Sequence, residues 1–167
     1  MLFRSQDVGV VPAQVAGGRL VAIALLGDGQ ADDARLRIGD AFEHGVGVFL
    51  GHHHALHRAH HAQLLARDPR AFVIGQGLWS PWYAGTSLEN LDREFGRDRV
   101  LDSPVSENAV TGLAIGAALS GLRPIVFHPR MDFMLLAVDP IVNQAANWSF
   151  LFAGQVSVPL VIRAVIN

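Results

Sequence analysis

A stretch that reads Asp102-Ser103-Pro104-Val105-Ser106-Glu107 leads into a run of very small residues, Gly112-Leu113-Ala114-Ile115-Gly116-Ala117-Ala118. A carboxylate at the start of a helix is common, because the unpaired amide groups and the helix dipole favour negative charge there. The run that follows is less ordinary, because each glycine inside a helix costs about 1 kcal/mol relative to alanine. Two glycines four residues apart therefore predict a helix, 105–120, that another helix or backbone segment approaches closely.

Helix and strand signals alternate on both sides of this stretch. Upstream we expect a helix at 54–67, ended by Asp68-Pro69 because a residue before proline disfavours the helical conformation. This alternation is typical of a parallel α/β sheet. The remaining expected elements are strands at 71–75, 100–101, 123–127 and 159–166, a loop at 76–86, a helix from about 87, and helical sequence at 132–152.

One proline falls inside the last helical segment. Pro140 follows Asp139, and a proline in a helix interior costs about 3 kcal/mol because it removes a hydrogen bond and clashes with the preceding turn. We predict a kink there; alternatively, Asp139 is the N-cap and Pro140 the first residue of a new helical segment.

Length, charge and composition restrict the functional class. The chain has 167 residues, the size of one domain, and its net charge of −2 without a basic block excludes a nucleic-acid footprint. It has no Cys, so disulfides and thiol chemistry are excluded. Its apolar runs are shorter than the 18 or so residues that a membrane helix needs, and it lacks a signal peptide, which predicts no membrane contact and a cytoplasmic location.

Taken together, the motifs resemble the β subunit of pyruvate and branched-chain 2-oxo acid dehydrogenases. The resemblance covers about 110 residues, in collinear order, and implies that 51–167 is a partial, truncated thiamine-diphosphate pyrimidine-binding domain. It also implies a three-layer α/β/α fold with a mostly parallel sheet. The matching stretches are 68–75, 95–100, 103–107, 112–118, 121–125, 132–133, 142–146, 154–155 and 158–163.

The resemblance assigns roles to three side chains. Glu107 matches the catalytic glutamate that bonds the aminopyrimidine ring nitrogen of thiamine diphosphate and exchanges a proton with it. Burial would favour the neutral form of such a carboxyl. Phe133 matches the aromatic residue that stacks on the pyrimidine. Gln76 stands where family members often place an acidic residue near the cofactor, so it would bind by its amide rather than by charge.

The resemblance also implies partners. The diphosphate and its magnesium would be bound by the α subunit, a second β subunit would pack on the Gly112/Gly116 helix in a heterotetramer, and a lipoyl acyltransferase core would receive the acyl group. The family's later strands and C-terminal domain would follow Asn167, so the fragment is expected to be inactive alone. Two alternatives stay open: a non-catalytic assembly module derived from the same domain, and a transketolase-like enzyme.

Other features receive simpler interpretations. The segment 1–50 fits no part of the β subunit, so we expect an atypical, non-native segment that is poorly ordered or packs badly, with one strand at 20–26. Six histidines within 52–61 favour adventitious metal binding over a physiological site. Gly27-Asp28-Gly29 is interpreted as a turn. His128, beside a proline, is interpreted as a packed or surface residue, and the aromatic residues of 79–83 as either buried loop residues or part of a substrate entrance.

Overall fold

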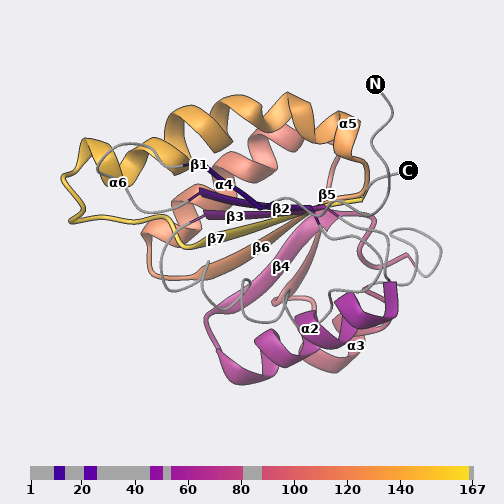
Figure 1. Ribbon diagram of the computed structural model, residues 1–167. Coiled ribbons are helices and arrows are strands. Elements are labelled where there is room, and N and C mark those ends of the chain that lie inside the picture. Colours follow the sequence, from indigo (N-terminus) through magenta and orange to yellow (C-terminus); the bar gives the residue numbers. More distant parts are fainter. Residues whose placement is uncertain (1–9, 14–20, 26–45, 51–53, 81–87, 166–167) are drawn as a thin grey trace.

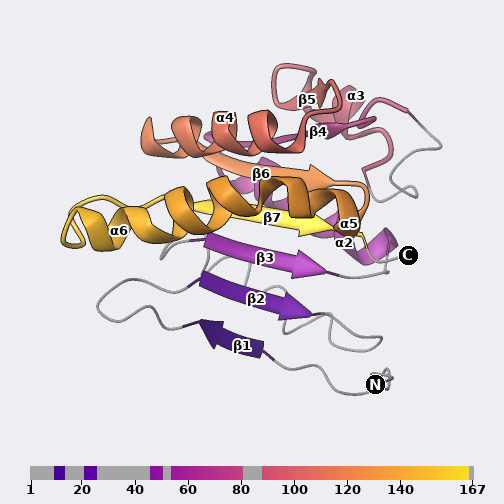
Figure 2. The same ribbon diagram turned by 90° about the horizontal axis from the view of Figure 1, so that it is seen from above.

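The computed structural model describes residues 10–13, 21–25, 46–50, 54–80 and 88–165. Within them the chain forms a seven-stranded sheet in the order β1-β2-β3-β7-β6-β4-β5. Every neighbouring pair is parallel except β1 and β2, which are antiparallel. Figure 2 shows this order from above, with the β1 arrow reversed. The strands are β1 Val10–Ala13, β2 Val21–Leu25, β3 Val46–Leu50, β4 Ala71–Gln76, β5 Val100–Ser103, β6 Arg123–His128 and β7 Leu160–Ala164.

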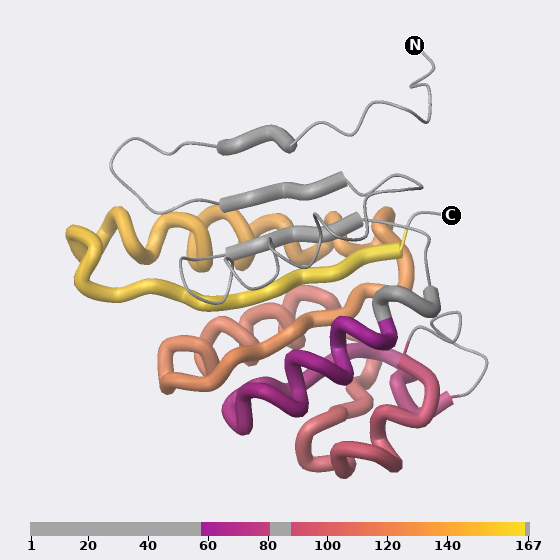
Figure 3. Tube along the Cα trace, turned by 60° about the horizontal axis from the view of Figure 1, so that its bottom comes forward, coloured from indigo at the N-terminus to yellow at the C-terminus, as the bar shows by residue number. Residues whose placement is uncertain are grey.

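Helices cover both faces of the sheet, which gives the three layers expected from the resemblance. The helix α4 and the helical segment 131–151 lie over one face, and α2 and α3 lie over the other (Figure 1). Figure 3 shows α2 in front of the sheet and the 131–151 segment behind it. The helices are α2 His54–Arg67, α3 Leu91–Phe95, α4 Glu107–Leu119, α5 Met131–Met134, a 3₁₀ turn Leu135–Ala137, a π-helix Pro140–Ala146 and α6 Asn147–Leu151.

The strands of the sheet are apolar on both sides because both sides are covered. Buried parallel strands are expected to be near-continuous runs of apolar residues, and β4 follows this rule with Ala71 to Gly75 all buried. Alternate residues of β4, β6 and β7 enter two separate cores. Phe72 and Ile74 pack beneath α4 with Ala114 and Ala118. Val73 packs on the opposite face in the α2/α3 core, which also contains Leu65, Leu91, Val100, Ile125, Phe127 and Val161.

Most predicted elements are present, with one helix start displaced. The helix at 54–67 and the predicted strands correspond to described elements, although β5 extends two residues further than expected, to Ser103. The helix expected from about residue 87 begins only at Leu91. Asn90 explains the difference, because its backbone is left-handed (φ 60°) and a left-handed residue cannot continue an α-helix. The α3 helix then ends at Gly96, whose φ is 87°.

The segment around Pro140 departs from regular α-helix, as its sequence predicts. Residues 135–137 form a 3₁₀ turn and 140–146 a π-helix, so the α-helical hydrogen-bond pattern is broken on both sides of Asp139. The new helical segment begins at Pro140 with Asp139 at the N-cap position, as predicted, but the Asp139 side chain makes no capping hydrogen bond. The Asp139 backbone is helical (φ −58°, ψ −58°), and its carboxylate accepts a hydrogen bond from Asn143 Nδ2 at 2.8 Å.

The N-terminal part contributes strands to the same sheet. The strand expected at 20–26 is present as β2, which pairs with β3, and β3 pairs with β7. At the level of backbone pairing, the sheet therefore continues across the predicted boundary at residue 50. The packing predicted for this segment and the Gly27-Asp28-Gly29 turn lie outside the described residues, and the boundary stays a prediction.

Candidate functional site

The order of the strands creates a crevice at one end of the sheet. From β4 the chain crosses to β5 on one side, and from β5 it returns through α4 to β6 on the other side of β4. The two connections lie on opposite faces, so they separate at the carboxyl end of β4. In open α/β sheets, ligands bind in the crevice at such a switch point. The topology alone therefore places a candidate site beyond Gln76, Ser103 and His128, the last residues of the three strands.

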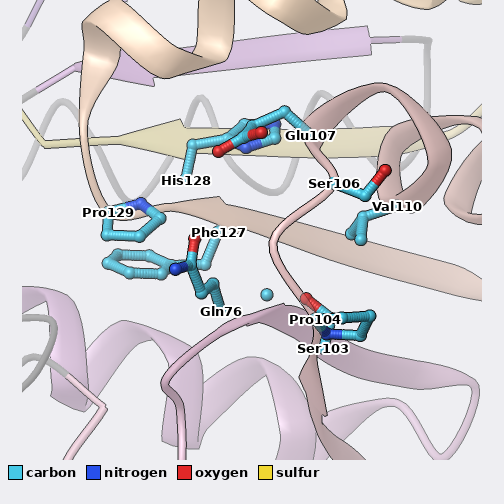
Figure 4. A pocket seen from close by; sticks show the side chains of 10 residues that line it. Gln76, Ser103, Pro104, Ser106, Glu107, Val110, Phe127, His128 and Pro129 are labelled. Carbon is cyan, nitrogen blue, oxygen red and sulfur yellow. The ribbon is translucent and has the colours of Figure 1, made fainter.

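A pocket lies at this place. Figure 4 shows its side chains converging from the ends of β4, β5 and β6 and the start of α4. The space among its lining residues, together with the part open to solvent, is about 200 Å³. The lining residues are Gly75, Gln76, Ser103, Pro104, Ser106, Glu107, Val110, Phe127, His128 and Pro129.

A glycine allows two of the strands to meet closely at the pocket floor. A Cβ atom on Gly75 would collide with the backbone oxygen of Phe127 and would lie 2.9 Å from the Phe127 Cβ. Real Cβ atoms do not approach backbone so closely, so any larger residue would push β4 and β6 apart. The register pairs these two residues directly. Gly75 is therefore required for the geometry of the crevice.

Glu107 is the acidic residue of the pocket. It is the first residue of α4, where the unpaired amides and the helix dipole favour an acid. Glu107 is only 7% exposed. Acidic residues are rarely so buried without a partner or a function. The sequence predicted this side chain as the catalytic one, and the structure places it in the pocket wall.

Gln76 is the second predicted residue that the structure brings to the pocket. It is the last residue of β4, half-buried, and its amide points toward the pocket from the wall opposite Ser103 and Pro104 (Figure 4). The adjoining turn is held by Asp102, whose carboxylate accepts a hydrogen bond from the Leu78 amide at 3.0 Å. The turn after β4 and the end of β5 are thereby locked together.

Phe133, the third predicted residue, is not one of the lining residues. It lies on α5, four residues after the pocket residue Pro129, and is 46% exposed. The Arg130 guanidinium lies over its ring, 4.6 Å from the centroid. The structure thus does not bring Phe133 together with Glu107 and Gln76. Its ring is exposed near the same edge of the sheet, and the stacking role stays a prediction.

His128 also lines the pocket, although the sequence alone did not mark it as part of a site. It ends β6, is 2% exposed, and its Nε2 is 3.2 Å from the Thr111 hydroxyl. Burial lowers the pKa of His128 to about 4, so the imidazole is neutral near pH 7. The interpretation as a packed residue is correct, but the position at a strand end beside β4 also puts it in the pocket. That position depends on strand pairing, which no local pattern shows.

The two glycines of α4 face outward. A Cβ on Gly112 or Gly116 would meet no described atom within 4 Å. The close neighbour that the sequence predicts for this helix is therefore not within the described part of the chain. Leu113, between them, is 55% exposed.

Two further predictions concern metals and membranes. Within the described residues, no group of three or more His, Cys, Asp or Glu could hold a metal ion. Two histidines of the cluster, His60 and His61, are buried on α2, whereas His52 and His53 lie outside the described residues. No helix in the described ranges has the length and apolarity to cross a membrane.

Comparisons with known proteins agree with this architecture. The family model described as the transketolase pyrimidine-binding domain matches residues 53–167, more than half of the chain. The mitochondrial pyruvate dehydrogenase E1 component subunit beta-2 of Oryza sativa subsp. japonica is 39% identical over 99 residues, which are 59% of this chain and 26% of that protein.

Two other relatives extend the comparison. The pyruvate dehydrogenase E1 component subunit beta of Rickettsia conorii is 41% identical over 99 residues, covering 59% of this chain and 30% of the relative. The mitochondrial subunit beta of Drosophila melanogaster is 38% identical over 99 residues, covering 59% and 27%. The chain thus matches between about a quarter and a third of the length of these relatives.

Proposed function

Because the chain belongs to the transketolase pyrimidine-binding domain family and is related to pyruvate dehydrogenase β subunits, we propose that it holds and activates the aminopyrimidine of thiamine diphosphate. It would do so within the decarboxylating component of a 2-oxo acid dehydrogenase complex. The observation that carries the proposal is the buried carboxyl of Glu107 in a small pocket at the switch point of the sheet.

The chemistry of the pocket fits an uncharged heteroaromatic ring. Its ten lining residues, all in the described part of the chain, include neither Lys nor Arg. They offer a carboxyl, an amide, an imidazole and hydroxyls, which can satisfy the ring nitrogens and the amino group of a pyrimidine. A diphosphate would need cations or a magnesium ion. This difference supports a division in which the α subunit binds the diphosphate and the metal.

Each residue then has a limited task. Glu107 would bond the ring nitrogen through its carboxyl and exchange a proton with it. Gln76 would hydrogen-bond at the ring edge, and the exposed ring of Phe133 would stack on the pyrimidine. When bound, the cofactor supplies the electron sink that allows a 2-oxo acid to lose carbon dioxide.

The test is Glu107→Gln in the complex assembled with its α subunit, which keeps the size of the side chain and removes its acid. We expect the decarboxylation rate to fall at least about 100-fold, the usual contribution of a general acid–base group. Assembly, measured by gel filtration, should be unchanged. Glu89→Gln, the same change at an exposed position, is the control. Normal turnover of the Glu107 variant would overturn the role proposed for this residue.

A second candidate is a non-catalytic assembly module that keeps the helix interface. The exposed apolar surface of α4 and 131–151 favours it, because contiguous apolar patches mark interaction sites. Either candidate would use the same partners: an α subunit, a second β subunit on the Gly112/Gly116 helix and a lipoyl acyltransferase core. Thiamine diphosphate binding after addition of the α subunit separates the candidates. The cytoplasmic location also stays a prediction, since two of the three relatives are named as mitochondrial.

A further inference from the structure

His128, one of the residues that line the pocket, lies within hydrogen-bond distance of a second buried polar side chain, Thr111, which is not itself a lining residue. Thr111, on α4, is fully buried, and its hydroxyl lies 3.2 Å from Nε2 of His128, at the end of β6. Burying polar groups is costly unless they are hydrogen-bonded, so the pair satisfies itself at the junction of a helix and a strand. The bond also restricts rotation of the imidazole. His128 is therefore a polar group with a fixed orientation.

The pair is positioned to act together with Glu107. Thr111 lies four residues after Glu107, one helical turn along the same buried face of α4. Glu107 and His128 both line the pocket, and their side chains overlap in the view of Figure 4. Because the Thr111 bond uses Nε2, Nδ1 is the imidazole nitrogen that remains for a ligand.

We propose that His128, anchored by Thr111, is a specificity-determining residue that reads the edge of the bound heteroaromatic ring beside Glu107. The inference rests on the proposed function and extends it to two residues that the resemblance does not assign. A neutral imidazole supplies one donor and one acceptor. With Nε2 engaged by the hydroxyl, a single hydrogen-bonding position remains for the amino-substituted edge of the pyrimidine.

The electrical state of the imidazole supports this role. Burial lowers the pKa of His128 to about 4, so it carries no charge over the range in which enzymes of neutral compartments work. A cation at this place would add a positive charge to the pocket that Glu107 also lines, and a neutral imidazole does not. His128 can thus discriminate by hydrogen bonding without disturbing its neighbour.

The test compares two ligands in the assembled complex: thiamine diphosphate, and oxythiamine diphosphate, in which a carbonyl replaces the ring amino group. The readout is the ratio of their dissociation constants by calorimetry. His128→Phe keeps a flat ring of similar volume and removes both nitrogens. We expect this variant to bind thiamine diphosphate about tenfold more weakly and to change the ratio by about fivefold, as the loss of one hydrogen bond would. General damage to the pocket would weaken both ligands alike and leave the ratio unchanged.

Two threonine variants test the anchor and cover the case in which His128→Phe does not fold. Thr111→Val removes the hydroxyl with little change in volume, and we expect the ratio to shift in the same direction by about threefold. Thr111→Ser keeps the hydroxyl and should restore the wild-type ratio. The matched control is Ser149→Ala, because Ser149 is another buried hydroxyl, but on α6 and without a hydrogen-bond partner in the described part of the chain. This variant should leave the ratio unchanged.

The outcomes distinguish the two proposals. If the wild-type complex does not bind thiamine diphosphate, the proposed function fails, and this inference fails with it. If the wild type binds but His128→Phe and Thr111→Val leave the ratio unchanged, the inference is overturned while the proposed function stands. A shifted ratio in both variants, restored in Thr111→Ser, supports the inference.

Discussion

The two helical layers of the molecule, α2/α3 on one face of the sheet and α4 with 131–151 on the other, differ in the contacts at their outer surfaces. On the α2/α3 side, arginines join the elements: Arg99 donates hydrogen bonds to the carbonyl oxygens of Leu65, Asp68 and Ala71. Arg58 of α2 reaches Glu89 and Glu94 in and beside α3. The Arg99 bonds satisfy carbonyl oxygens at the end of α2, and the Arg58 bonds attach α3 and the turn before it to α2. This layer is held by contacts within the chain.

The α4 layer presents apolar residues outward instead. Leu113 on α4 is 55% exposed, Leu136 is 63% exposed and Leu151 is 66% exposed. The glycines of α4 add open space on the same helix. Among the described residues, the α2/α3 layer is thus joined by hydrogen bonds within the chain, whereas the α4 layer exposes apolar side chains of the kind that interaction surfaces have. The pocket belongs to the second layer, because α4 and the end of β6 form its walls.

The largest expected effect concerns the buried imidazole of the α4 layer. Burial lowers the pKa of His128 to about 4 from its ordinary 6.5. Because the folded-state pKa is depressed, the stabilisation is fully present above pH 6.5 and is lost as the pH falls from 6.5 toward 4. The linkage amounts to about 2–3 kcal/mol. Urea unfolding at pH 7.5 and pH 4.5 should show this extra loss in the wild type but not in His128→Phe. Equal losses in both proteins would mean that another group causes the pH dependence.

Removing the arginine that closes the other layer should cost somewhat less. In Arg99→Ala the carbonyl oxygens at the end of α2 lose their charged donor, and we expect the free energy of unfolding to fall by about 2 kcal/mol. Arg93→Ala, on the exposed side of α3, should change it by less than about 0.5 kcal/mol. Thermal unfolding of both variants measures the difference. If they behave alike, Arg99 does not close this layer.

A substitution on the α4 layer is expected to raise the free energy of unfolding instead of lowering it. Gly116→Ala introduces a methyl group where no described atom lies within 4 Å, so the chain gains helix propensity without a clash. Its free energy of unfolding should rise by about 1 kcal/mol. If a second subunit packs on this helix, the same methyl should weaken assembly. Calorimetry and sedimentation measure the two effects, and a destabilised chain would show that this helix is already covered.

The smallest effect should come from the ion pair between α2 and α3. Nη2 of Arg58 lies 3.0 Å from Oε2 of Glu94, and the two side chains are 35% and 48% exposed. Solvent screens such a pair, so Glu94→Gln should lower the free energy of unfolding by no more than about 0.5 kcal/mol. A loss of more than 1 kcal/mol would mean that this contact, rather than Arg99, holds the layer.

The sequence predicted those features that depend on local chemistry. Asp68-Pro69 ended the first helix as expected, and Gly121, with a φ of 95°, follows the end of α4. Glu107 was predicted from its position at a helix start together with the resemblance. The structure places it in the pocket with Gln76.

The features that the sequence did not predict depend on strand pairing or on the conformation of a single residue. His128 has no distinguishing neighbours, and its place in the pocket follows from the pairing of β6 with β4. The start of α3 depends on the left-handed backbone of Asn90, which a propensity argument cannot specify for a single residue. Phe133 lies outside the pocket lining, with the Arg130 guanidinium over its ring, and its stacking role stays a prediction.

The π-helix at Pro140–Ala146 determines which side of its segment is buried. Ala137, Ile141, Ala145 and Ser149 are buried at intervals of four residues. In a regular α-helix each residue rotates by about 100° around the helix axis, so four residues make one full turn and about 40° more. Positions four residues apart would therefore rotate progressively away from the sheet. The wider turns of the π-helix reduce this drift. A helical wheel drawn at 3.6 residues per turn would therefore assign the wrong exposed face to residues beyond 146. The wider turns thus offset the rotation of the buried positions around the helix axis, so that the same side of the segment stays buried along its length.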